Sequence, residues 1–357
     1  MGRRPLVLLV FAVALAFAAA PLLSGRQTDF TAYVEAARAL RAGKDPYLGV
    51  PPYLYPPLLA VLLVPLTFVP VKVAAWGWAV ASAAALATAA FLVARESTRI
   101  ARVLVLALLF APFAATQWNL QANAFVLLLI VLARAALDEK HQIGGGVALG
   151  LSIALKPFAL VAVLALLLVG RWRAALFAAG TALSSFLLVL PFLGMTGAAA
   201  SAGHVTGILR SSWVETYGGN ISFNGTIDRL ASAGAGVSRH RSVAAAIMGW
   251  SLALVVASAW NARRRGKALR PSAVIDLILA ATFLSASSSW LHHSTVLFPA
   301  VAVLPPFVQA GVALLYAAAS TWRLAPPGEA AALASLAGTV ALIVVWLFAG
   351  RRAAEPC

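Results

Sequence analysis

The stretch that decides the fold is "GVALGLSIALKPFALVAVLALLLVGRWR", residues 146–173. It is an apolar run with one internal charge, Lys156, which Pro157 follows directly. Both the preceding segment, "RAALDEKHQ", and the closing "GRWR" carry the basic residues typical of cytoplasmic loops. A helix that crosses the membrane once would put these segments on opposite sides. The sequence therefore predicts a re-entrant or broken helix pair that turns near Lys156-Pro157, where protein or a water-filled cavity must surround the break.

The composition of the 357-residue chain is that of an integral membrane protein. Hydrophobic residues make up 62% and charged residues 11%, whereas soluble domains average about 25% charged residues. We expect a single all-α, polytopic membrane domain, residues 1–357, with about ten membrane segments. The apolar segments are residues 5–23, 73–94, 103–116, 124–137, 144–169, 172–193, 243–261, 272–286, 294–320 and 331–350.

The net charge of +16 comes from Lys and Arg residues that cluster in short runs between the apolar segments. This distribution follows the positive-inside rule and indicates a lipid bilayer as the partner, not nucleic acid. It places the N-terminus and the basic run 261–270 inside, and the loops 24–72 and 194–242 outside. The orientation of the C-terminal segments, residues 301–357, stays open. The first apolar segment has the shape of a signal peptide, but we expect it to remain as the first transmembrane helix.

The first outer loop contains "TDFTAYVEAARALRAGKDPYLGVPPYLYPP", residues 28–57, which predicts a surface helix. Thr28 can cap this helix, and Gly43 and Asp45-Pro46 end it. We expect it to lie on the membrane, with its cations near lipid headgroups and the tyrosines of the loop at the interface. The apolar face, the cations and the tyrosines are, in turn, Phe30, Val34 and Ala37; Arg38, Arg41 and Lys44; and Tyr47, Tyr53 and Tyr55.

Asp29, His292 and His293 are the candidate acid–base residues. An acid at the mouth of a membrane protein can take a proton from a sugar hydroxyl, but an Asp in the first turn of a helix also complements the helix dipole. The histidines end the stretch "SSSWLHH", residues 287–293. They can serve as base, orienting residue or phosphate ligand, or lie at the membrane interface. No HExxH motif accompanies them, and the only cysteine is Cys357, so no metal site or disulfide framework is predicted.

Lys156 and several amides are candidates for substrate binding. A charge inside a membrane segment is costly and usually faces a cavity or a partner, of which a phosphate is one. The alternative is a lysine that snorkels or bonds a backbone carbonyl. Amides suit sugar hydroxyls because they donate and accept without charge, although they are also common in turns. They crowd two connectors, as Gln117, Asn119, Gln121 and Asn123, and as Asn220, Ser222 and Asn224.

Four stretches, in order along the chain, resemble glycosyltransferase family 87, the polytopic mannosyltransferase-like proteins that use polyprenyl-phosphate sugars. They are "TDFTAYVEAARALRAGKDPYLGVPPYLYPPLLAVLLVPL", "QWNLQANAFVLLL", "GVALGLSIALKPFALVAVLALLLVGRWRA" and "SWLHH". The first carries an Asp, a Tyr four residues later, then G-x-D-P-Y and Y-P-P. The resemblance covers residues 24–300. One departure is Thr116, which stands where the Gly-Gln-x-Asn connector of the family usually has its glycine.

The resemblance implies a C-type glycosyltransferase fold with its active site on the outer face of the plasma membrane, and neither metal nor other cofactor. Asp29 matches the essential acid of the family, Lys156 falls in its lysine–proline segment, and His292 or His293 falls in its Trp-x-His segment. The implied reaction moves a sugar, first of all mannose, from a polyprenyl-phosphate donor to a glycolipid or cell-envelope glycan. The residues expected to bind donor phosphate or substrate are Lys156, Tyr33, Tyr55, Gln117, Asn119, Asn220 and Arg210.

Two other functions are compatible with the sequence. A transporter or flippase of lipid-linked sugars would also explain Lys156 and the broken helix, but it predicts internal repeats, and no convincing repeat is present. A non-catalytic membrane subunit of an envelope-polysaccharide complex would share the hydropathy, and predicts that Asp29 is dispensable. We favour the transferase and leave open whether Asp29 or a histidine is the base.

Overall fold

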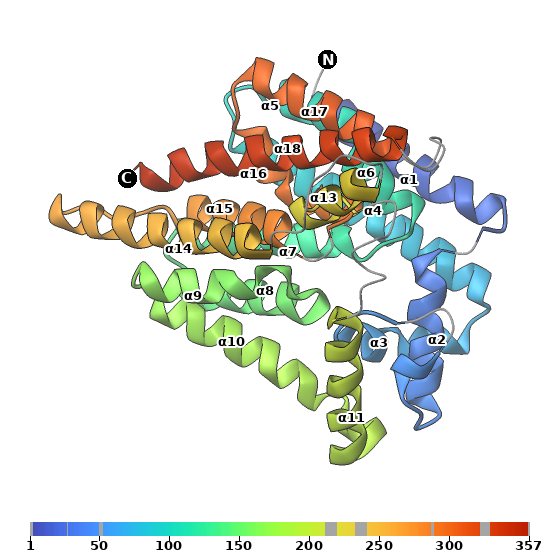
Figure 1. The fold of residues 1–357 in the computed structure, drawn as a ribbon. Coiled ribbons are helices and arrows are strands. Elements are labelled where there is room, and N and C mark those ends of the chain that lie inside the picture. The colour runs from blue at the N-terminus through green and yellow to red at the C-terminus, as the bar shows by residue number, and fades with distance from the viewer. Residues whose placement is uncertain are drawn as a thin grey trace.

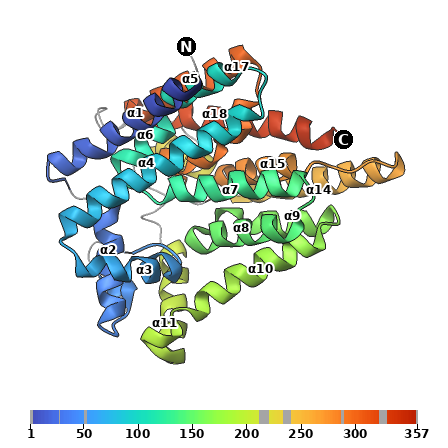
Figure 2. The same cartoon turned by 180° about the vertical axis from the view of Figure 1, so that it is seen from behind.

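The computed structural model describes residues 3–26, 28–49, 53–210, 220–232, 241–286, 289–321 and 329–355. Within these residues the chain is helical throughout, and the only β pairing is an isolated bridge between Asn220 and Trp290. The prediction of an all-α protein is confirmed. Long helices lie side by side, and shorter helices cover one end of them (Figures 1 and 2).

The helices follow the predicted apolar segments closely. The α-helices are α1 Arg3–Leu23, α2 Asp29–Arg41, α3 Pro57–Leu63, α4 Val71–Arg95, α5 Ile100–Leu109, α6 Ala111–Trp118, α7 Asn123–Asp138, α8 Gln142–Leu155, α9 Leu160–Leu168, α10 Trp172–Leu187, α11 Leu190–Arg210, α13 Phe223–Ser232, α14 Arg241–Arg264, α15 Pro271–Ser285, α16 Phe298–Ala302, α17 Pro306–Ser320 and α18 Glu329–Ala354. The 3-10 helices are η1 Pro46–Leu48, η2 Val64–Phe68, η3 Pro157–Ala159 and η4 Leu291–Leu297.

Fewer of these helices than expected are long enough to cross a membrane. Four of them, α1, α4, α14 and α18, have the length and hydropathy of a span. Two bent pairs, α5–α6 at 51° and α10–α11 at 100°, raise the number to six if each pair is one span. The prediction of about ten membrane segments is therefore not confirmed. The segments lie where the sequence placed them, but breaks at proline and glycine leave several too short.

The predicted break at Lys156-Pro157 is present. Lys156 has φ −150° and ψ 127°, which ends α8, and η3 and α9 follow. A Cβ on Gly146 would meet the carbonyl of Ala174 at 2.5 Å, and one on Gly150 would meet that of Ala178 at 2.6 Å. From Gly146 to Gly150 the contact moves four residues forward on α8, and from Ala174 to Ala178 it moves four residues forward on α10. The two helices are therefore parallel. The segment between them, η3 and α9, must therefore run back in the opposite direction. The connectors before α8 and before α10 then lie at the same end of the helices, as their basic residues indicated.

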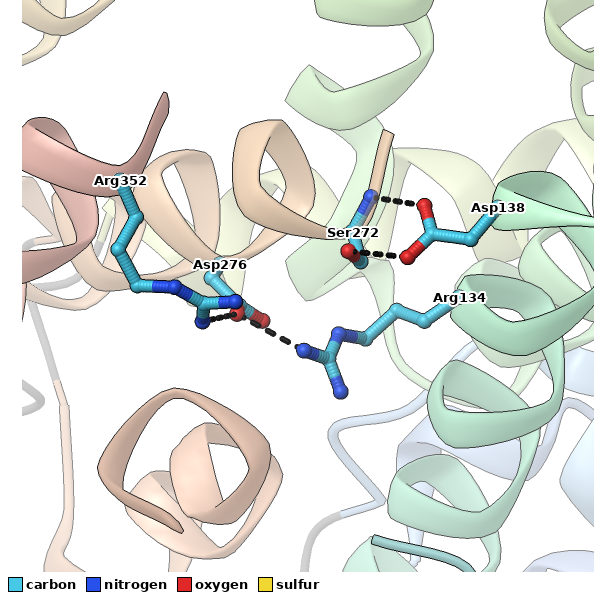
Figure 3. A network of polar contacts seen from close by, with 5 residues as sticks. All are labelled: Arg134, Asp138, Ser272, Asp276 and Arg352. Atoms are coloured by element: carbon cyan, nitrogen blue, oxygen red, sulfur yellow. Dashed lines mark hydrogen bonds and ion pairs between the residues drawn. The ribbon is translucent and has the colours of Figure 1, made fainter. Parts of the chain in front are cut away.

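A charge cluster around the buried pair Arg134–Asp276 joins the helix ends that carry the basic connectors (Figure 3). An Arg134 Nη2 on α7 lies 3.0 Å from Asp276 Oδ2 on α15, and Arg352 Nη1 on α18 lies 3.6 Å from the same oxygen. Asp138, at the end of α7, accepts from Ser272 N at 3.1 Å and from Ser272 Oγ at 2.6 Å. In this cluster α7 and α18 end and α15 begins.

The candidate site residues lie at the other end of the same helices. The 16 residues of α7 span about 24 Å at 1.5 Å per residue, which separates Asn123 from the charge cluster at Asp138. In Figure 1 the ends of α14 and α18 lie on the left, and α2, α3 and α11 lie on the right. Long helices therefore separate a basic end from an end with the predicted outer loops.

The helix predicted in the first outer loop is α2. Thr28 occupies the N-cap position, although its side chain makes no cap hydrogen bond, and Gly43 follows the helix with φ +67°. The predicted apolar face is buried, with Phe30 and Val34 both 1% exposed. Arg41 donates to Thr67 Oγ1 at 2.9 Å, so this cation is held by protein. The predicted position of α2 on the membrane surface is not tested by these contacts.

The prediction that the loop tyrosines lie at the membrane interface stays a prediction, but the structure adds that protein encloses their rings. Tyr47, Tyr53 and Tyr55 are all buried, and the ring centroids of Tyr47 and Tyr53 are 5.5 Å apart. The Tyr47 hydroxyl donates to Tyr55 O at 2.9 Å, and the Tyr53 hydroxyl donates to Pro56 O at 2.7 Å. These rings bury apolar area against each other while their hydroxyls find carbonyl partners.

Candidate active site

The connector between α6 and α7 is held in place by hydrogen bonds from α2 and α4. The backbone amide of Asp29, at the start of α2, donates to Asn119 O at 3.1 Å. The indole of Trp78 on α4 donates to Leu120 O at 2.9 Å. Two backbone carbonyls of the connector thus receive donors from two helices, which fixes its position relative to the first outer loop.

Gln121 is the point at which three elements meet. Its Oε1 accepts from the Tyr33 hydroxyl of α2 at 3.0 Å and from the Tyr55 hydroxyl of the loop before α3 at 2.9 Å. The same oxygen accepts from Lys156 Nζ, in the break after α8, at 2.8 Å. Gln121 is fully buried. One amide oxygen therefore sets the relative positions of the first outer loop and the lysine–proline break.

Lys156 is a buried cation without a close carboxylate. Its residue is 2% exposed, and its Nζ lies 4.6 Å from the ring centroid of Tyr55 and 5.3 Å from that of Phe158. Among the described residues, no carboxylate oxygen lies within 4.0 Å of this ammonium. An ammonium has three donors, of which Gln121 takes one. A buried charge with spare donors is costly unless an anion completes it.

The carboxylate of Asp29 lies in the electrostatic field of this cluster. Asp29 is half-buried, and its charge acts on Lys156. Burial raises the pKa of the Tyr55 phenol well above its usual value, and the charge of Asp29 raises it further. Burial, then Tyr55 and then Asp29, raises the pKa of Tyr33 in the same direction. Both phenols therefore remain protonated donors near neutral pH.

The histidine segment is attached to the other side of the connector. Asn123 Nδ2 donates to His292 O at 2.6 Å, and Thr116 Oγ1 donates to the same carbonyl at 3.2 Å. The ring of His293 lies 4.7 Å from that of Phe158, centroid to centroid. Phe158 follows Lys156 by two residues, so the histidine segment and the lysine–proline break are neighbours.

His293 is arranged as a neutral ring. Its Nδ1 accepts from the backbone amide of Trp290 at 3.3 Å. Burial lowers the pKa of His293 well below its usual value, and the charges of His292 and Lys156 lower it further. In a neutral imidazole one nitrogen accepts and the other carries the proton, so Nε2 is assigned as the donor.

The remaining predicted residues lie around this cluster. Asn220 is fully buried, and its Oδ1 accepts from Ser289 N at 2.8 Å, so this side chain joins the second outer loop to the histidine segment. Gln117 Nε2 donates to Ser82 Oγ at 3.0 Å, toward α4, and Asn119 Nδ2 donates to Ala115 O at 2.7 Å. Arg210 ends α11, and its side chain lies outside the described structure.

The structure thus brings together Asp29, Tyr33, Tyr55, Lys156 and His293. Gln121, at the centre of the cluster, was one of the connector amides singled out from the sequence, but Gln117 and Asn119 were the two expected to bind substrate. The crowding of four amides in the connector indicated it, but spacing alone did not distinguish Gln121 from Gln117. Within the described residues no three His, Cys, Asp or Glu side chains are grouped as a metal ion would require.

The class that the structure defines is a helical protein with four to six candidate membrane spans and a buried cation, Lys156, at one end. The family model for glycosyltransferase family 87 matches residues 53–291, which is more than half of the chain. The chain therefore belongs to glycosyltransferase family 87, and the protein is a glycosyltransferase. Comparison with curated proteins and with solved structures gave no match.

The matched region includes Lys156 and Gln121 but not every site residue. Asp29 and Tyr33 precede residue 53, and the two histidines follow residue 291 directly. The case for Asp29 therefore depends on its place four residues before Tyr33 on α2 and on the effect of its charge on Tyr55 and Lys156.

One residue of the connector between α6 and α7 has a backbone conformation that glycine adopts most easily. Thr116, read above in place of the glycine, is an ordinary residue of α6. Leu120 instead has φ +50°, a conformation that costs most residues about 1–2 kcal/mol and that glycine adopts freely. Gln121 and Asn123 follow it with the spacing Gln-x-Asn. The glycine-like backbone of the connector thus lies at Leu120, directly before Gln121.

Proposed function

We propose that this glycosyltransferase moves a sugar, with mannose the first candidate, from a polyprenyl-phosphate donor to a hydroxyl of a glycolipid or cell-envelope glycan. The reaction takes place at the outer face of the plasma membrane and uses no metal ion. The observation that carries the proposal is the buried ammonium of Lys156, which has no carboxylate within 4.0 Å among the described residues and lies in the field of Asp29.

In the proposed chemical step, Asp29 takes up a proton and Lys156 faces the negative charge of the leaving group. The Asp29 carboxylate takes the proton of the acceptor hydroxyl, and the hydroxyl oxygen attacks the anomeric carbon of the sugar. The bond between that carbon and the phosphate oxygen breaks, and its electron pair leaves with the polyprenyl phosphate. Lys156 stabilises the negative charge that develops on the leaving phosphate, which is the role of a preorganised cation in a water-poor site.

Asp29 suits the role of base better than His293. The Nδ1 lone pair of His293 already accepts from Trp290 N, and its remaining nitrogen carries a proton. A neutral imidazole in this state can donate to a phosphate oxygen but cannot take a proton at the same nitrogen. Asp29 is half-buried, so an acceptor from outside can reach its carboxylate.

Apolar side chains beside the site support a lipid-borne substrate. Leu62 of α3, Phe68 of η2 and Val73 of α4 are 56%, 72% and 60% exposed. They follow directly on the tyrosine loop that contacts Gln121 and Lys156. Exposed apolar side chains suit contact with hydrocarbon, so a polyprenyl tail can stay in lipid while its phosphate reaches Lys156.

The donor class is tested with the purified protein in nanodiscs and a crude lipid extract as acceptor. Transfer is measured from radiolabelled polyprenyl-phospho-mannose, polyprenyl-phospho-arabinose and a nucleoside-diphosphate mannose. We expect transfer from a polyprenyl-linked donor and none from the nucleotide donor. Transfer from the nucleotide donor alone would refute the proposal. Movement of the lipid-linked sugar across a sealed vesicle, without any transfer, would identify a flippase instead.

A further inference from the structure

We infer that Gln121 is a positioning residue, which holds the Lys156 ammonium in place without neutralising it, so that its full charge acts on the donor phosphate. This inference rests on the proposed function, since the phosphate gives Lys156 its task. The Oε1 of Gln121 touches no reacting atom and acts through Lys156.

The geometry leaves little freedom in how Gln121 is oriented. Lys156 can only donate, so the amide atom at 2.8 Å from its Nζ must be the oxygen. The Tyr33 and Tyr55 hydroxyls converge on the same oxygen at 3.0 and 2.9 Å. Because α2, the tyrosine loop and the break after α8 all depend on this acceptor, moving Gln121 would move the lysine and the platform that carries Asp29.

A glutamate at this position would satisfy the same three donors, which makes the choice of an amide informative. A carboxylate would attract Lys156 more strongly and form a buried ion pair with it. That pair would cancel the charge offered to a phosphate. A neutral amide fixes the ammonium through one hydrogen bond and adds no countercharge. The site thus contains an amide oxygen, which positions Lys156, and not a carboxylate, which would stabilise its charge most.

The other half of the amide points to the same conclusion. Gln121 Nε2 is buried and has no hydrogen-bond partner within the part of the chain that the structure describes. Buried donors are nearly always satisfied. Nε2 shares a carbon with the oxygen that holds Lys156, so it lies beside the same site. An anion bound to Lys156 would be within reach of a second, neutral donor.

The test compares Gln121→Glu with Asn261→Asp, which also turns an amide into a carboxylate but lies at an exposed position of α14. We expect Gln121→Glu to keep or raise the melting temperature, because all three donors retain an acceptor. Its kcat/KM for the polyprenyl-phosphate donor should fall roughly 10- to 100-fold, as expected for losing a charge-assisted contact, and KM for the acceptor should not change. Asn261→Asp should match wild type in both measurements.

A second variant and a binding measurement separate this inference from the proposed function. Gln121→Met removes the acceptor altogether, and should lower both the melting temperature and the activity. Binding of a polyprenyl monophosphate, the expected by-product, is measured for wild type and Gln121→Glu. Weaker binding by the variant supports the inference even if wild type transfers no sugar, an outcome that would reject only the proposed reaction. Wild-type kinetics for Gln121→Glu, or no binding by either protein, would overturn the inference.

Discussion

The side-chain amide of Asn123 donates to the carbonyl oxygen of His292 at 2.6 Å, and so ties the first residue of α7 to a segment 169 positions further along the chain. Thr116, on α6, donates to the same carbonyl from the other side of the connector. The connector therefore positions the histidine segment as well as the first outer loop.

Replacing Asn123 should disturb the histidine segment. Asn123→Ala removes one buried donor to His292 O, which should cost about 1–3 kcal/mol of unfolding free energy and reduce transfer. Asn123→Asp should cost more, because a carboxylate would face the carbonyl. Melting temperature and kcat/KM are measured together. Asn261→Ala, at an exposed position of α14, is the control, and an Asn123→Asp variant as stable and active as this control would contradict the assignment.

The parallel packing of α8 and α10 should tolerate no side chain at Gly150. A Cβ there would lie 2.6 Å from both Ala178 O and Thr181 Cβ, so Gly150→Ala should lower stability by about 1–3 kcal/mol through overpacking. Gly144→Ala, in the first turn of the same helix, faces open space and should be neutral or slightly stabilising. Thermal unfolding in detergent distinguishes the two. Equal melting temperatures would show that α8 and α10 are not packed in this way.

The charge cluster at the basic end should contribute stability and not catalysis. Asp276→Asn leaves the buried guanidinium of Arg134 without its carboxylate, a loss of about 3–5 kcal/mol. Because the cluster and the candidate site are at opposite ends of α7, the folded fraction should keep its specific activity. Glu355→Gln, at an exposed position after α18, is the control. A loss of specific activity without a loss of stability would contradict this separation.

The two ends of the helices should be accessible from opposite sides of the membrane. In a Cys357→Ser background, a cysteine is placed at Lys44, after α2, or at Lys267, in the basic connector; both positions are exposed. A membrane-impermeant maleimide added to intact cells should label Lys44→Cys and not Lys267→Cys. Permeabilised cells should give labelling of both. The reverse pattern in intact cells would place the candidate site in the cytoplasm.

Local signals in the sequence were sufficient for the elements that depend on them. The start of α2, its end before Gly43 and the break at Lys156 all come from residues whose backbone preferences act within a few positions. Hydropathy located the helices, but it did not give their lengths. Hydropathy does not show that the chain bends at Phe110, between α5 and α6. It also does not show that the chain reverses after Lys156, which leaves α8 and α9 too short to span the membrane.

The centre of the site depends on contacts that sequence patterns do not encode. Gln121 meets Tyr33 across 88 positions and Tyr55 across 66. The composition of the loop suggested interfacial tyrosines, whereas packing of the rings against each other encloses them. The glycine-like backbone of Leu120 was also hidden, because a leucine gives no sign of a positive φ. Asp29 and Lys156 were found because an acid opening a helix and a charge in an apolar run stand out on their own.

The most direct test of the account is the rate of sugar transfer from a polyprenyl-phosphate donor by Asp29→Asn. The matched control is Glu35→Gln on the same helix, whose carboxylate pairs with Arg38 at 2.6 Å and lies outside the cluster. We predict that Asp29→Asn folds with a wild-type melting temperature and loses roughly 10²- to 10⁴-fold in kcat, the contribution of a general base, while Glu35→Gln retains its rate. Equal transfer by wild type and Asp29→Asn would contradict the assignment of Asp29 as the base.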